Sequence, residues 1–198
     1  MNTAIDQTTQ DSLMLRLKQE TLTEHDRMER LMEQSGVFDS QNNYAQFTLS
    51  QYYFQKDVEH LYLDQKVQAL IPDLDVRGRS EAAYQDLVDL EIKPQQETVA
   101  TNSVQYPESL GWIYVSEGST LGAAFLYKAA QAKFGFNADF AARNLAAYPE
   151  GRAIVWKRFK QTLDGAGFNE EEKNKIIAGA LAGFKRFGDL LQDLPNLK

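Results

Sequence analysis

The sequence contains no cysteine, which excludes disulfides, thiolate metal ligands and cysteine nucleophiles. Histidine is nearly as scarce: only His25 and His60 occur, so a metal site built from several histidines is nearly excluded. A ferritin-like di-iron site needs a pair of Glu-x-x-His motifs, and this sequence has none. The common phosphate-loop, dinucleotide-binding and Gly-x-Ser-x-Gly motifs are missing as well. A metal or cofactor bound by these 198 residues would therefore have few cysteine or histidine ligands.

Positive charge is also in deficit. With 21 Lys and Arg against 28 Asp and Glu, the net charge is −7, which argues against a general nucleic-acid-binding protein. No stretch approaches the roughly 18–20 apolar residues of a membrane helix. The first residues, MNTAIDQTTQDS, are polar and acidic, so we expect no signal peptide. These features favour a cytoplasmic protein of one domain, without nucleic-acid or membrane partners, which we expect to be a monomer.

The apolar residues recur at helical spacing, and no alternating strand pattern or internal repeat is present. We therefore predict a disordered lead over residues 1–10 and a single all-α domain over 11–198. Asn169, followed by three glutamates, is a strong signal for the start of the last helix. The about seven predicted helices cover residues 11–34, 40–70, 80–90, 107–134, 137–147, 151–163 and 169–194.

The most unusual predicted helix contains GWIYVSEGSTLGAAFLYKAA, residues 111–130. Gly118 and Gly122 lie in its middle, and each costs a helix about 1 kcal/mol relative to alanine. Residues four apart share a face, so the two glycines expose a patch of bare backbone. On this stretch alone, close packing against another helix is the simpler interpretation, and a flat ligand is the alternative. The same face also carries Gly111, Tyr114, Leu121 and Phe125.

His25 lies on a partly apolar face of the first helix, where a lone histidine is usually a hydrogen-bonded core residue. Two neighbours favour a ligand role. Glu29, one turn onward, can accept a hydrogen bond from the second ring nitrogen of a metal-bound imidazole. Lys18, two turns earlier and about 10 Å away along the axis, can bind a carboxylate at the edge of a porphyrin. Haem with one histidine ligand also needs an open opposite face, which a glycine backbone provides. For His60, a structural role is the simpler interpretation.

Two segments carry a family resemblance. LKQETLTEHDRMERLM resembles the proximal helix of haem oxygenases, and GWIYVSEGSTLGAAFLYK resembles the distal helix of the bacterial haem oxygenases with which Gram-negative pathogens extract iron. The similarity continues through NNYAQFTLSQYYFQKDVEHLY, LIPDLDVRGR and AARNLAAYPEGRAIVWKRF, and so covers roughly residues 10–192. It implies a haem-oxygenase-like helical fold in which haem is sandwiched between the first helix and the glycine-bearing helix.

The resemblance assigns roles residue by residue. His25 matches the proximal iron ligand, and Glu29 matches an acidic position near it. Gly118 and Gly122 match the distal glycines, whose backbone approaches the haem and allows the helix to bend.

Other positions follow in the same way. Lys18 and Tyr114 match the pair that holds the haem propionates in the members that cut at the α-meso carbon; relatives without the pair release other biliverdin isomers. Phe125 is expected to contact the cofactor, and Ser119 to hydrogen-bond locally.

Two further residues, Gln51 and Arg79, match polar members of a distal water network. Gln55 and Asn144 depart from the pattern, because some relatives have histidine at these positions. The departures concern details of the water network and leave the iron ligand untouched.

The implied activity is the cleavage of haem b, both cofactor and substrate, with O2 as co-substrate, to biliverdin, CO and Fe2+. The resemblance implies an external electron donor of the ferredoxin or ferredoxin-NADP reductase type. Its docking surface is expected near the basic residues Lys128, Lys133, Arg143 and Arg152.

The alternative is a non-catalytic haem carrier or sensor, which would use His25 in the same way and would offer a second axial ligand. A helical enzyme of the thiamin-degrading type would need a cysteine nucleophile, so the composition disfavours it.

Overall fold

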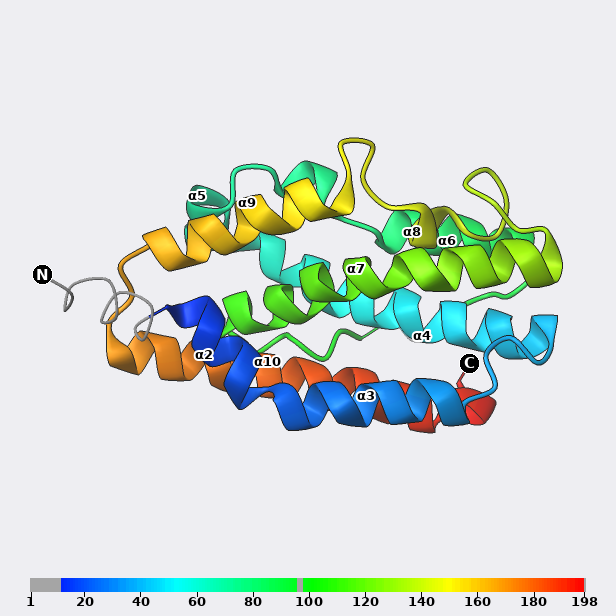
Figure 1. Cartoon of the computed structure of the whole chain (residues 1–198), viewed down its shortest axis with the longest axis horizontal. Coiled ribbons are helices and arrows are strands. Elements are labelled where there is room, and N and C mark those ends of the chain that lie inside the picture. The colour runs from blue at the N-terminus through cyan, green and yellow to red at the C-terminus, as the bar shows by residue number, and fades with distance from the viewer. Residues whose placement is uncertain (1–11, 96–97, 198) are drawn as a thin grey trace, which may run out of the picture.

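The computed structural model describes residues 12–95 and 98–197, so the predicted disordered lead, residues 1–10, lies outside the described residues. In the described part the chain is helical apart from turns and isolated bridges around Asn137, which confirms the predicted fold class (Figure 1). None of its helices is long and apolar enough to cross a membrane. The α-helices are α2 (Leu13–Glu20), α3 (Leu22–Gln34), α4 (Gln41–His60), α5 (Gln65–Leu70), α6 (Ser80–Asp89), α7 (Ser109–Phe134), α8 (Arg143–Ala146), α9 (Arg152–Gly165) and α10 (Glu170–Gln192), with short 3-10 helices η1 (Leu61–Leu63), η2 (Leu74–Val76) and η3 (Leu194–Asn196).

The predicted first helix is divided into α2 and α3 at Thr21, so the single long helix was wrong. The Thr21 hydroxyl donates to the Leu17 carbonyl at 2.7 Å, and threonine bonds of this kind compete with the helical ladder. The predicted second helix is also divided. It leaves α-helical geometry after His60, and Asp64 then caps the short helix α5 through the amides of Lys66 and Val67.

The helix predicted over residues 137–147 is wrong for most of its length. Only Arg143–Ala146 is helical, because the buried carboxylate of Asp86 accepts hydrogen bonds from the amides of Arg143 and Asn144 and starts α8 there. The last predicted helix is confirmed. Asn169 and Glu172 form a reciprocal capping box at the start of α10.

The core forms where α7 crosses α10, and glycines allow the two backbones to meet. A side chain at Gly111 would collide with the main chain of α10 at Ile176 and Ala180. In return, a side chain at Gly179 would collide with the carbonyl of Glu108. Gly111 shares a helix face with Gly118 and Gly122, as predicted, but α10 covers that face at Gly111, which is therefore a packing glycine.

The helix α3 lies along the later part of α10, as Figure 1 shows at the lower edge of the molecule. Gly188 of α10 allows this approach, because the Arg27 guanidinium and the end of the Met28 side chain occupy the space that a β-carbon would take. Beyond its crossing with α7, α10 therefore packs against α3. Because α10 leaves α7 and continues along α3, the middle of α7 faces α3 without packing directly against it.

Candidate haem site

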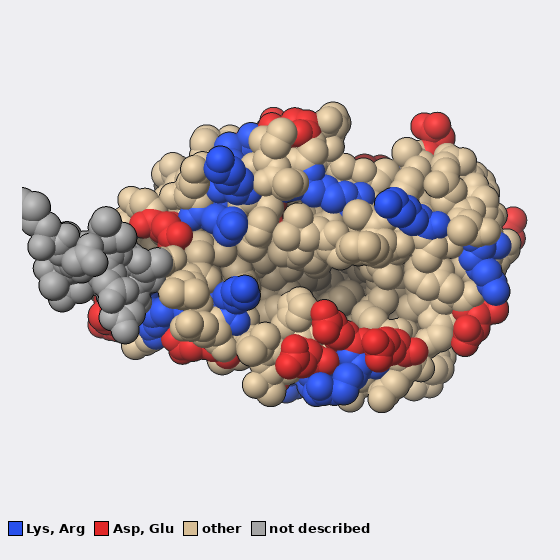
Figure 2. All heavy atoms as spheres, in the orientation of Figure 1, with Lys and Arg blue, Asp and Glu red and all other residues tan. Residues whose placement is uncertain are grey.

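A cavity of about 1660 Å³ lies between α2 and α3 on one side and the middle of α7 on the other. Figure 2 shows it as a hollow near the centre of this face. Side chains from α4, α9 and α10 complete its walls. Of the residues predicted for the site, every one contributes to the lining, so the fold brings them together: Lys18, His25, Glu29, Gln51, Arg79, Tyr114, Gly118, Ser119, Gly122 and Phe125.

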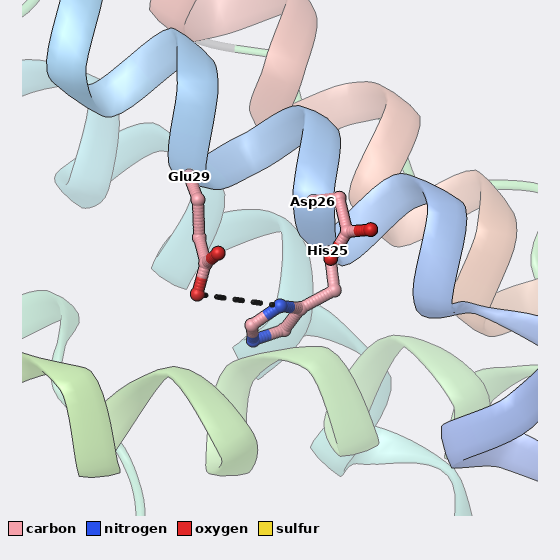
Figure 3. Close-up of side chains that lie close together, drawn as sticks. All are labelled: His25, Asp26 and Glu29. Carbon is pink, nitrogen blue, oxygen red and sulfur yellow. Dashed lines mark ion pairs between the residues drawn. The ribbon is translucent and has the colours of Figure 1, made fainter.

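His25 extends from α3 into the space between α3 and α7, as Figure 3 shows. Its imidazole Nδ1 lies 3.6 Å from Oε1 of Glu29, which is too long for a hydrogen bond but places the carboxylate beside that nitrogen. The imidazole packs edge-on against Phe184 of α10, with 6.5 Å between the ring centroids. The side chain is 59% exposed, so His25 belongs to the cavity wall and not to the core. Its other nitrogen, Nε2, is the atom that a metal in the cavity would meet.

The opposite wall of the cavity is the bare backbone of α7. A β-carbon added at Gly122 would meet nothing within 4 Å, and one added at Gly118 would touch only the ring of Trp156, at 3.7 Å. These two glycines are therefore not required for packing between helices, in contrast to Gly111. Between them, the Ser119 hydroxyl donates to the Ser116 carbonyl at 2.7 Å, a bond within the helix that leaves the backbone surface free.

One end of the cavity is cationic. Lys18 of α2 is exposed there, and Tyr114 of α7 is half-buried, with its ring against Trp156 at a centroid separation of 5.6 Å. Burial raises the pKa of the Tyr114 hydroxyl, and a side-chain hydrogen bond with Thr21 acts in the opposite direction. The tyrosine therefore stays neutral and able to donate. Two residues that the sequence did not suggest, Lys157 and Lys160 of α9, line the same region.

Three polar side chains in the cavity lining, the buried Arg79 and Asn144 and the half-buried Gln51, form a hydrogen-bonded cluster. Arg79 Nε donates to Oδ1 of Asn144 at 3.2 Å, and Asn144 Nδ2 donates to Oε1 of Gln51 at 3.1 Å. Arg79 also donates to the carbonyls of Arg143 and Asn144. Burial lowers the pKa of Arg79, which nevertheless stays charged. Gln51 and Arg79 are thus joined through Asn144, one of the two residues that depart from the family pattern.

The other departing residue, Gln55, accepts a hydrogen bond from the Ser116 hydroxyl at 3.2 Å and is buried beside α7. Phe125 lines the mouth of the cavity and is 76% exposed. His60 ends α4 and does not contribute to the lining, in line with a structural role.

Two of the basic residues expected near a protein partner are engaged within the fold. Arg143 forms ion pairs with Asp86 and Asp89, and Arg152 donates to the carbonyls of Thr120 and Leu145. The other two, Lys128 and Lys133 of α7, are exposed.

The cavity fits haem in each of its parts. It offers an imidazole on one wall and a bare backbone on the other, so an iron held by His25 has space on its far side. Apolar side chains of α4, α7 and α10 suit the porphyrin ring, and the cations at one end suit its two carboxylates.

Comparisons with known proteins agree with this geometry. The family model for haem oxygenase matches residues 11–193. The haem oxygenase PigA of Pseudomonas aeruginosa is 42% identical over 195 residues, which cover 97% of this chain and 98% of the relative.

Solved structures give the same result. The NO- and CO-bound haem oxygenase of Neisseria meningitidis has a TM-score of 0.87 and 34% identity, with 95% of this chain and 94% of that one covered. Haem oxygenase 2 of Chlamydomonas reinhardtii shares the fold, with a TM-score of 0.79 at 16% identity over 93% of this chain and 98% of that one. The chain therefore belongs to the haem oxygenase family.

Proposed function

We propose that this protein degrades haem with His25 as the iron ligand and that it opens the ring at the α-meso carbon to give biliverdin, CO and Fe2+. Haem degradation is the activity of the family to which the chain belongs. The observation that carries the finer proposal is the position of the His25 imidazole, which faces the bare Gly118 and Gly122 backbone across one cavity.

When bound, haem supplies the iron at which O2 is reduced and the porphyrin carbon that is oxidised. His25 would hold the iron through Nε2. Glu29, 3.6 Å from Nδ1, favours the tautomer that carries its proton on Nδ1, and so leaves Nε2 free to bind the metal. A small rotation of the exposed Glu29 side chain would complete that hydrogen bond.

The α7 backbone supplies the space for O2. Because Gly118 and Gly122 present no side chain, this wall leaves space for a small ligand, and the lining residues of α7 include no acidic side chain. The polar cluster of Gln51, Asn144 and Arg79 has the donors and acceptors to order water in the cavity, and we assign it that role. Water held by this cluster would deliver protons to the cavity, where α7 places no acidic side chain.

The electrostatics of the cavity rim orient the substrate. Figure 2 shows acidic side chains along the α3 edge of the hollow and basic side chains along its α9 and α7 edge. The two haem carboxylates would therefore lie away from the acidic α3 edge, toward Lys18 of α2 and the lysines Lys157 and Lys160 of α9. Lys18 and Tyr114 would hold these carboxylates, and the presence of this pair, which matches that of the α-cleaving members, is the basis of the proposed isomer.

A haem carrier or sensor would offer a second axial ligand, such as a histidine or methionine, on the wall opposite His25. The described residues of that wall provide neither. The described lining residues from α7 include neither histidine nor methionine. The methionines in the lining are Met14, Met28 and Met32, all from α2 and α3, the same side as His25. The open α7 wall therefore favours the enzyme.

We further propose a cytoplasmic monomer that receives electrons from a ferredoxin or a ferredoxin-NADP reductase. Lys128 and Lys133, exposed on α7, are the candidates for contact with an acidic donor. Charge reversal at both is expected to raise the KM for the protein donor and to leave turnover with a small chemical reductant unchanged. An equal KM for the variant and the natural protein would exclude this surface.

The proposed ligand is tested by titration of hemin into the protein and into the variant His25→Ala. The natural protein is expected to give a histidine-ligated Soret band, and H25A to lose it and to regain it when free imidazole is added. The control is His60→Ala, which should bind hemin normally. An unchanged Soret band in H25A would refute the assignment.

A further inference from the structure

Tyr148, in the turn between α8 and α9, has an unusual backbone for a bulky residue. Its φ is 37°, in the left-handed region that side chains rarely adopt, and the residue is 7% exposed. It does not line the cavity, although its neighbours Leu145 and Ala147 do. Strain at a buried residue next to a ligand cavity suggests that its side chain is needed in this position.

The Tyr148 hydroxyl supports the outer side of α7. It donates to Oε1 of Glu117 at 3.0 Å, and the other carboxylate oxygen, Oε2, accepts from Arg77 Nη1 at 2.6 Å. Glu117 is 1% exposed and directly precedes Gly118, so it anchors α7 from behind the glycine backbone. Burial raises the pKa of Glu117, and the charge of Arg77 and the hydrogen bond from Tyr148 oppose this rise.

The ring of Tyr148 supports a different part of the same wall. The Arg79 guanidinium carbon lies 5.6 Å from the ring centroid, in the range of a cation–π contact. Arg79 is 8% exposed and is the residue that holds Asn144, and through it Gln51. One side chain therefore contacts both parts of the wall that faces His25.

The rest of the turn strengthens this arrangement. Arg152, which follows the turn, donates to the Thr120 carbonyl at 2.6 Å and to the Leu145 carbonyl. Thr120 lies between the two glycines of α7, so the turn contacts that segment at two points, Glu117 and Thr120.

We propose that Tyr148 is a positioning residue for the distal wall: its hydroxyl holds the Gly118–Gly122 segment of α7 through Glu117, and its ring holds Arg79 and the Asn144–Gln51 pair. The role in turnover rests on the proposed function, whereas the structural coupling can be measured without haem.

The test compares Tyr148→Phe, which removes only the hydroxyl, with Tyr148→Leu, which removes the ring as well. The control is Tyr127→Phe: Tyr127 is on α7, its hydroxyl accepts one hydrogen bond from the Ala138 amide, and it lies outside the cavity lining. Two probes are followed by NMR in the full chain without haem. They are the hydrogen exchange of amides 117–123 and the protection of the Arg79 Nε–H.

In Y148F, amides 117–123 are expected to exchange about tenfold faster, the effect of losing one hydrogen bond to a charged group, while the Arg79 Nε–H stays protected. In Y148L both probes are expected to lose protection, and in Y127F neither. Unchanged exchange at 117–123 in Y148F, or an equal rise in every helix, overturns the role of the hydroxyl. An Arg79 Nε–H that stays protected in Y148L, or that is exposed already in Y148F, overturns the role of the ring. If Y148L does not fold, the two probes in Y148F still decide.

With haem bound, Y148F is expected to lower kcat several-fold and to leave the haem dissociation constant within about twofold of the natural value, because Tyr148 does not touch the cavity. An equal kcat would overturn the role in turnover. If the natural protein itself does not consume haem, the proposed function fails, and the exchange data still report on the coupling.

Discussion

Alanine at position 122 is expected to stabilise the protein and to damage its activity. Gly122 lies inside α7, where alanine is favoured over glycine by about 1 kcal/mol. The added methyl group meets no protein atom within 4 Å, so nothing in the fold opposes this gain. For a chain of this size, 1 kcal/mol corresponds to a rise in Tm of about 2–4 °C.

The same methyl group projects toward the space that His25 faces. Overpacking a fitted site costs about 1–3 kcal/mol, so haem affinity or turnover is expected to fall about tenfold. The assays are thermal unfolding without haem, hemin titration, and the rate of Soret loss with reductant and O2.

Gly111→Ala is the matched control, because Gly111 lies on the same helix but packs against the α10 backbone. This variant is expected to be clearly destabilised, since its methyl group collides with main-chain atoms at Ile176 and Ala180. A G122A protein that is less stable than the natural one, or that binds and consumes haem normally, would refute the reasoning.

Three further predictions concern the ends and the interior of the site. Replacing Lys18 with Ala and Tyr114 with Phe together is expected to convert a single biliverdin isomer into a mixture, as seen by chromatography, and an unchanged α product would contradict the proposed orientation. Arg77→Met leaves the buried Glu117 without its cation and is expected to lower the free energy of unfolding, measured in urea, by about 3–5 kcal/mol. The control Lys175→Met, on the surface, should leave the urea midpoint unchanged. A small effect of R77M would show that the ion pair between Arg77 and Glu117 is not essential for stability. Burial alone would raise the pKa of Asp73, but hydrogen bonds from Arg77 and Arg158 lower it below the ordinary value of 3.8. The contribution of Asp73 to the free energy of unfolding is therefore present above pH 3.8 and is lost as the pH falls through the lower folded-state pKa. Below pH 3.8 the free energy of unfolding should fall less steeply in Asp73→Asn than in the natural protein, and identical slopes would contradict this.

The features set by short-range chemistry could be predicted from the sequence. The capping box at Asn169 needs only neighbouring residues and forms as predicted. The bare patch at Gly118 and Gly122 follows from helical spacing alone, and the structure leaves both positions free of helix packing. His25 and Glu29 lie one helical turn apart, so their proximity could also be predicted from the sequence.

The features set by the paths of other helices could not be predicted. Gly111 lies on the same face as Gly118, but the α10 backbone packs directly against α7 at Gly111 and not at Gly118, and the sequence does not reveal where that contact ends. The start of α8 depends on Asp86, which is distant along the chain.

Some functional candidates were missed for the same reason. Lys157 and Lys160 reach the cavity only because α9 packs beside α7. Tyr148 has no sequence signal, because its role comes from Glu117 and Arg79, which lie on other elements.

The central claim is that the His25 and glycine walls form a site in which haem is consumed. It is tested most directly by adding reductant and O2 to the protein with one equivalent of hemin and recording the spectrum. The account predicts loss of the Soret band, growth of biliverdin absorbance and release of CO. A Soret band that persists through these conditions, with no biliverdin formed, would contradict it.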